Sequence, residues 1–154
     1  MADTTPAIEA LQQWCTQERI ADWVVIDQAR IDAFANATED RYWLHTKPER
    51  ARAETPFGGS IAHGFLLLSL TVGDDVVQIT GLPGVVRVLN YGLDKARFLS
   101  PVRSGARVRV HSKVDSLVEK NPGQWLVRQI KTVEVEGQSG PALVAEQLAL
   151  VSLA

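Results

Sequence analysis

The chain has 154 residues, of which 45% are hydrophobic, so it can bury one core but is too short for two ordinary domains. We therefore expect one domain over residues 1–154. The 16 basic and 18 acidic residues give a formal net charge of −2, which leaves no excess positive field to attract nucleic acid. The single cysteine, Cys15, excludes an internal disulfide and fits a reducing compartment.

Nothing in the sequence indicates export or membrane insertion. Residues 1–6 have neither the basic start nor the apolar run of a secretory signal. The longest apolar stretch, 61–72, is interrupted by polar residues and falls short of the roughly 20 apolar residues that a membrane span requires. We expect a cytoplasmic protein without a membrane partner.

The first third of the chain is expected to be helical with one short strand. Apolar spacing predicts a helix over 6–16, and residues 23–26 read as a strand. Asp27 can cap a second helix, which should end near Thr38, because its carboxylate can accept hydrogen bonds from the free amides of the first turn. An irregular region follows, with a small helical piece after Pro48.

Residues 63–80 are predicted to form the central helix. The segment is apolar around most of its circumference, which requires burial. Its acidic pair, Asp74 and Asp75, is expected to mark a turn that reaches solvent.

The second half of the chain alternates in the manner of strands. Residues 106–118 place valines on one side and basic residues on the other, and similar runs occupy 85–91, 124–136 and 142–153. Turn residues such as Asn121–Gly123 separate them, so we expect an antiparallel sheet. A sheet with one apolar face and one strongly hydrophobic helix can wrap around that helix as an α+β layer structure.

A carboxylate and an imidazole lie five residues apart in the irregular region. Hydration of a double bond needs one group to take a proton from water and another to supply a proton to carbon, and Asp40 with His45 can divide these steps near neutral pH. The residues alone leave another interpretation open, in which Asp40 caps a turn and His45 is an ordinary half-buried histidine.

Gly64 stands at the start of the central helix. Free amides at a helix N-terminus can stabilise the developing negative charge of an enolate oxygen, and glycine allows the close approach. Equally, Gly64 can serve only to let the helix pack tightly.

In order along the chain, Asp40, His45, Phe57-Gly58-Gly59 and Ile61-Ala62-His63-Gly64 resemble the pattern of MaoC-like dehydratases, a family that includes R-specific enoyl-CoA hydratases. The resemblance continues through residues 90–102 and is strongest to the nodulation-protein-N-like branch.

This resemblance implies a hot-dog fold, usually a homodimer, that converts a trans-2-enoyl thioester of coenzyme A or a related carrier to the (R)-3-hydroxyacyl thioester, or the reverse. It implies that Asp40 and His45 handle the water and the proton, and that the Gly64 amide polarises the thioester carbonyl. No metal or redox cofactor would be required.

Two positions depart from the pattern: Glu39 replaces a common glycine, and Tyr42 replaces a carboxamide. Glu39 could move the turn or place a second negative charge beside Asp40.

Two other functions stay open, a hot-dog acyl-CoA thioesterase and an acyl-thioester-binding protein without turnover. A catalytic carboxylate on the central helix would favour the thioesterase, whereas Glu39 and Tyr42 favour the binding protein. The three histidines lack the spacing of metal ligands, so a zinc site is not expected. We expect His63 to hold its loop by hydrogen bonds.

Overall fold

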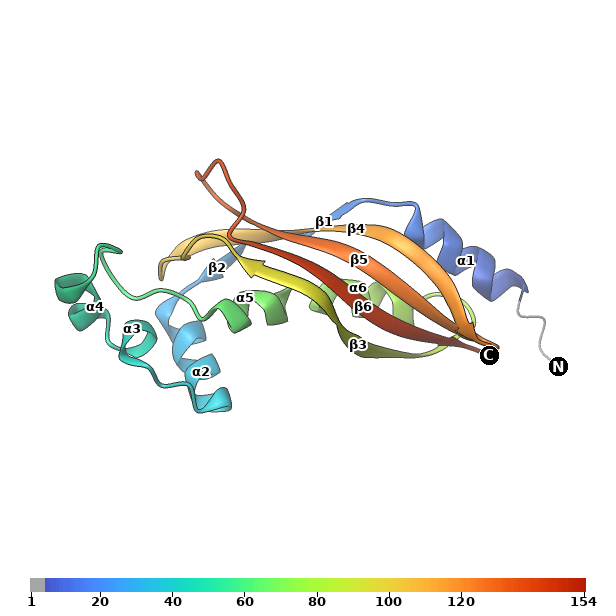
Figure 1. The fold of residues 1–154 in the computed structure, drawn as a ribbon, viewed down its shortest axis with the longest axis horizontal. Coiled ribbons are helices and arrows are strands. Elements are labelled where there is room, and N and C mark those ends of the chain that lie inside the picture. The colour runs from blue at the N-terminus through green and yellow to red at the C-terminus, as the bar shows by residue number, and fades with distance from the viewer. Residues whose placement is uncertain (1–4) are drawn as a thin grey trace.

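The computed structural model describes residues 5–154 (Figure 1). Its elements follow in the order α1 (Thr5–Cys15), β1 (Arg19–Ile20), β2 (Val24–Ile26), α2 (Gln28–Thr38), α3 (Trp43–Thr46), α4 (Pro48–Glu54), α5 (Gly64–Leu70), α6 (Gly73–Thr80), β3 (Val85–Phe98), β4 (Ala106–Asn121), β5 (Gln124–Val135) and β6 (Leu143–Leu153). Within this range no helix combines the length and the hydropathy needed to cross a membrane.

The strands form one antiparallel sheet in the order β1-β4-β5-β6-β3, and β2 also pairs with β4. Alternation on β4 follows the prediction, with Val108 and Val110 buried and Arg107 and Arg109 on the opposite side. β3 extends from Val85 to Phe98, well beyond the predicted end of that strand, and lies at one edge of the sheet.

The helices α5 and α6 follow each other along one side of the sheet (Figure 1). Near α5, Leu66 and Leu67 share a core cluster with valines of β4 and β5. A second cluster near α6 joins Ile79 to α1 and to the far ends of β5 and β6. The helices α3 and α4 lie beyond the α5 end of the sheet (Figure 1). The loop after α2 reaches the start of α5, where Nε2 of His63 contacts the Asp40 backbone carbonyl.

The central helix differs from its prediction in two ways. It is interrupted between Leu70 and Gly73, where the Thr71 hydroxyl donates to the Leu68 carbonyl at 2.7 Å and competes with the helical pattern. The helix is also buried on one side only, because the sheet covers only the side that faces it. On the other side, Phe65 is 67% exposed and Val77 is 72% exposed.

Local signals at the ends of α2 explain how the chain reaches the irregular region. The Asp27 carboxylate accepts from the Arg30 amide at 2.8 Å, which confirms the predicted cap. The helix ends at Thr38, and Glu39 follows with φ 63°, in the left-handed region. This turn directs residues 40–46 back toward the start of α5.

Candidate functional site

Three polar side chains from separate segments meet at the start of α5. Asp40 follows α2, His45 lies on the single turn of α3, and His63 immediately precedes α5. A carboxylate oxygen of Asp40 and one ring nitrogen from each histidine all lie within 4.8 Å of one another. The structure therefore brings Asp40 and His45 together, as the sequence predicts, and adds His63.

The hydrogen bond of His45 defines its tautomer. Nδ1 lies 2.7 Å from the Ile61 carbonyl oxygen, which can only accept, so Nδ1 carries a proton. In the neutral ring Nε2 then keeps its lone pair. Burial lowers the pKa of His45 below its usual value, and the neighbouring His63 lowers it further, although the bond to Ile61 and the charge of Asp40 oppose these effects. The neutral form of His45 is therefore favoured at pH 7.

Gln28 holds the backbone on both sides of the site. Its amide donates to the His45 carbonyl at 2.7 Å, and its side-chain oxygen accepts from the buried Ser60 hydroxyl. One side chain thus ties α2 to α3 and to the loop before Ile61. Sequence reasoning missed Gln28 and Ser60, because nothing local distinguishes them from other polar residues at a helix start and in a loop.

The Asp40 carboxylate caps a turn and remains partly accessible. One carboxylate oxygen lies 3.4 Å from the Tyr42 amide, as in a turn cap, while about half of the side chain stays accessible. The two departures from the family pattern lie around it. Glu39 forms an ion pair with Arg41, and Tyr42 packs edge-on against His45 with ring centroids 5.9 Å apart. Neither Glu39 nor Tyr42 lines the cavity described next.

A cavity of about 430 Å³ opens over these groups. Its polar end is formed by Asp40, His45 and His63, and its remaining walls are mostly apolar. The lining residues beyond this polar end are Ile61, Ala62, Gly64, Phe65, Leu67, Phe98, Leu99, Ser100, Pro101 and Val102. An apolar cavity with a few convergent polar groups is typical of a small-molecule site.

Both interpretations of Gly64 are compatible with its surroundings. A Cβ atom at this position would lie 2.8 Å from Cδ1 of Phe98, so close packing requires glycine. The amides of Leu66 and Leu67 already donate to the His63 carbonyl, whereas the Gly64 amide precedes the first helical hydrogen bond. Gly64 lines the cavity, and its amide is one of the first-turn amides without a helical acceptor.

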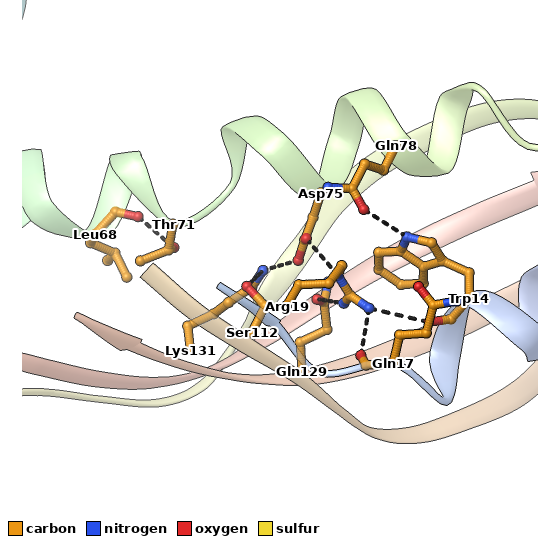
Figure 2. Close-up of polar contacts among 10 residues, drawn as sticks. All are labelled: Trp14, Gln17, Arg19, Leu68, Thr71, Asp75, Gln78, Ser112, Gln129 and Lys131. Carbon is orange, nitrogen blue, oxygen red and sulfur yellow. Dashed lines mark hydrogen bonds and ion pairs between the residues drawn. The ribbon is translucent and has the colours of Figure 1, made fainter. Parts of the chain in front are cut away.

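A second polar cluster lies beneath α6 (Figure 2). Asp75 is buried and forms ion pairs with Lys131 and with Arg19, the latter at 3.1 Å. Lys131 also donates to the Ser112 hydroxyl at 2.9 Å. The prediction that the acidic pair reaches solvent is therefore wrong for Asp75, although it is correct for Asp74.

The meeting of Asp40, His45 and His63 also has the residue types and spacing of a metal site. Spacing along the chain does not indicate a zinc site, because His45 and His63 are far apart in the sequence and meet only in the folded structure. Nε2 of His63, however, lies 2.9 Å from the Asp40 backbone carbonyl and must donate to it. Only its Nδ1 could then bind an ion.

The family model described as "MaoC like domain" matches residues 11–138. The chain belongs to the MaoC-like family. Nodulation protein N of Rhizobium leguminosarum bv. viciae is 40% identical over 134 residues, covering 85% of this chain and 81% of that protein. The 3-hydroxyacyl-thioester dehydratase Z of Mycobacterium tuberculosis is 44% identical over 128 residues, covering 83% of each chain.

Solved structures of this family confirm the predicted hot-dog fold. The (R)-hydratase from A. caviae, described as involved in PHA biosynthesis, matches with a TM-score of 0.74 and 26% identity, covering 91% of this MaoC-like chain and 96% of the hydratase. A protein described as a monoamine oxidase regulatory protein from Archaeoglobus matches with a TM-score of 0.77 and 25% identity over 91% of both chains. The resemblance stated from the sequence, including its nodulation-protein-N-like branch, is thus confirmed.

Proposed function

We propose that this protein hydrates trans-2-enoyl-CoA to (R)-3-hydroxyacyl-CoA, or catalyses the reverse dehydration, with Asp40 and His45 as the reacting pair. Membership of the family and the similarity to an (R)-hydratase and a 3-hydroxyacyl-thioester dehydratase support this reaction class. The observation that carries the proposal is the meeting of a carboxylate and a neutral imidazole, within 4.8 Å, at the polar end of an otherwise apolar cavity.

The spacing of the pair suits one substrate water. Hydrogen bonds to oxygen and nitrogen span about 2.7–3.2 Å, so one water can bridge two acceptors up to about 5 Å apart. A carboxylate oxygen of Asp40 and a ring nitrogen of His45 lie within 4.8 Å of each other. The Asp40 carboxylate holds this water, and Nε2 of His45 takes the proton that the water loses. His45 is suited to the role because Nδ1 donates to Ile61 and leaves the lone pair on Nε2.

The remaining steps return that proton to the substrate. The water oxygen bonds to C3 of the enoyl group, and the electron pair of the double bond moves toward the thioester carbonyl as an enolate. The imidazolium of His45 then protonates C2, and the Asp40 carboxylate stabilises the imidazolium until that transfer. The Gly64 amide donates to the carbonyl oxygen, where the enolate charge develops.

The test is an absorbance assay for loss of a short and a medium trans-2-enoyl-CoA, with free thiol measured in the same samples. Asp40→Asn and His45→Ala should each reduce turnover by at least about 100-fold, the usual contribution of a positioned acid or base. His111→Ala is a matched control, because His111 pairs with Glu134 on the sheet, far along the chain from the site. Normal turnover in both site variants would refute the assignment.

The thiol measurement also addresses the thioesterase alternative. The acidic residue of the central helix that faces the interior, Asp75, is held in ion pairs with Lys131 and Arg19, which disfavours it as a catalytic carboxylate. Hydration should therefore proceed without thiol release. Binding of acyl-CoA with neither hydration nor thiol release would instead support a role in binding alone.

We also propose that the active form is a homodimer joined through the β3 edge. A strand edge leaves backbone amides and carbonyls unpaired, and two identical edges can pair antiparallel about a two-fold axis. Apolar side chains that are at least 46% exposed lie along β3, and they are Val86, Leu89, Tyr91, Leu93 and Phe98. Exposure of so much apolar surface to water is unfavourable. A second copy of the chain that packs against β3 would bury this surface.

Light scattering coupled to gel filtration tests this assembly. Leu93→Lys should shift the protein toward monomer, because it places a charge at the proposed contact. Val25→Lys is the matched control, since Val25 is as exposed as Leu93, at 46%, but lies on β2, which pairs with β4 and not with the β3 side of the sheet. A wild-type monomer at micromolar concentration would refute the dimer.

A further inference from the structure

The imidazole of His63 touches both members of the proposed reacting pair. Its Nε2 donates to the Asp40 backbone carbonyl at 2.9 Å and lies 3.9 Å from the Asp40 carboxylate. Its ring stacks on that of His45, with centroids 3.9 Å apart and planes inclined by 26°. The ring itself is held in place, since His63 is only 2% exposed and packs against Phe34 with centroids 5.0 Å apart.

We propose that His63 is a positioning residue, which fixes the Asp40 carboxylate and the His45 imidazole relative to each other; this rests on the proposed hydration. Asp40 needs such support because it follows a single left-handed turn and its side chain is 53% exposed. His45 needs it because α3 is only one turn long. Because the rigid, buried ring of His63 contacts both segments, it fixes the distance between them.

The polar character of His63 argues against a role in packing alone. Its Nδ1 is buried and has no hydrogen-bond partner within residues 5–154. A buried acceptor without a partner costs free energy, and an apolar side chain of similar size would avoid this cost. An apolar replacement would lose the Nδ1 lone pair and the bond from Nε2 to Asp40, and of these only the bond contacts a member of the reacting pair.

Two substitutions separate the hydrogen bond from the packing. His63→Phe keeps a ring that can stack on His45 but has no N–H to donate. His63→Gln loses the ring but carries an amide N–H the same number of bonds from the backbone as Nε2. His111→Ala is the matched control, because it removes a histidine that pairs with Glu134 on the sheet and touches neither Asp40 nor His45.

In steady-state hydration of an enoyl-CoA, we expect His63→Phe to lower kcat by about tenfold, which is the effect of one lost hydrogen bond on the transition state. KM should stay within about twofold, since His63 holds the reacting groups and not the acyl chain. His63→Gln should recover most of kcat, and His111→Ala should keep it. Wild-type kcat in a folded His63→Phe protein, or equal losses in His63→Phe and His63→Gln, would overturn the proposal.

Folding is checked by near-ultraviolet circular dichroism, and His63→Met replaces His63→Phe if the latter does not fold. Failure of the hydration itself is recognised separately, because wild-type protein would then turn over no enoyl thioester. Crystal structures of wild type and His63→Phe then decide the positioning role: a changed separation of the Asp40 carboxylate from His45 supports it, and an unchanged separation overturns it.

Discussion

Replacing Asp75 with asparagine is expected to destabilise the protein strongly. The substitution preserves the shape of the side chain but removes the negative charge that Lys131 and Arg19 share (Figure 2). Lys131 is fully buried, and its ammonium group would keep only neutral acceptors there, the Ser112 hydroxyl and the amide oxygen of the new asparagine. Leaving a buried charge without its partner costs about 3–5 kcal/mol, so we expect the free energy of unfolding at pH 7 to fall by about that amount.

The stability lost in Asp75→Asn, relative to the wild-type protein, should diminish as the pH rises. Burial lowers the pKa of Lys131, and Asp75 is the main opposing influence, so its removal lowers that pKa further. Between the lowered pKa in the folded state and the ordinary lysine pKa of 10.5, the unfolded chain binds a proton that the folded chain has released. Stability of the variant therefore increases with pH through this range, because the neutral lysine no longer needs a counter-charge.

Urea unfolding at several pH values and at one fixed protein concentration measures both effects. Asp74→Asn is the matched control, because Asp74 is exposed. This substitution should lower the free energy of unfolding by less than about 0.5 kcal/mol. Adding Lys131→Met to Asp75→Asn should recover much of the stability, since the uncompensated charge is then gone. A loss below about 1 kcal/mol in Asp75→Asn, independent of pH, would show that this ion pair is not desolvated as the structure indicates.

Three further predictions concern the site. Glu39→Gly should raise the free energy of unfolding by about 1 kcal/mol, because glycine adopts the φ of 63° without steric cost. The exposed ion pair with Arg41 that is lost contributes little. Urea unfolding should find this gain in Glu39→Gly and not in Glu39→Gln. The acidic limb of the pH profile of kcat/KM should have its midpoint below 6.5, because the neutral His45 is the base and its pKa is lowered; a midpoint above 6.5 would contradict this assignment. Gly64→Ala should lower the free energy of unfolding by about 1–3 kcal/mol in thermal or urea unfolding, because the added Cβ overlaps the Phe98 ring. Adding Phe98→Leu should recover part of that stability, whereas additive losses in the double variant would argue against the contact.

Much of the fold could be predicted from local patterns. The cap at Asp27 depends on one carboxylate and the amides next to it, so it could be read from a few residues. Alternation over β4 identified the buried face correctly, because successive side chains of any strand point to opposite sides. The interruption after Leu70 was missed, since apolar spacing stays continuous across it and the Thr71 hydroxyl that competes with the helix is common in intact helices.

For the site, the sequence identified Asp40, His45 and Gly64 through motif spacing and family resemblance, and the structure places all three at one cavity. It did not reveal that His63 would stack on His45. That contact joins residues 18 positions apart in segments without regular periodicity, so no local rule predicts it.

The tertiary structure alone decided the environment of the charged groups. Asp74 and Asp75 are indistinguishable in the sequence, yet one is exposed and the other is buried against Lys131. The difference arises because α6 turns one side toward the sheet, and its rotation is set by packing of Ile79 and its neighbours in the core. Local sequence therefore determined most of the elements and offered candidates for the reacting residues, whereas burial and pairing depend on how those elements pack, a property that no short segment contains.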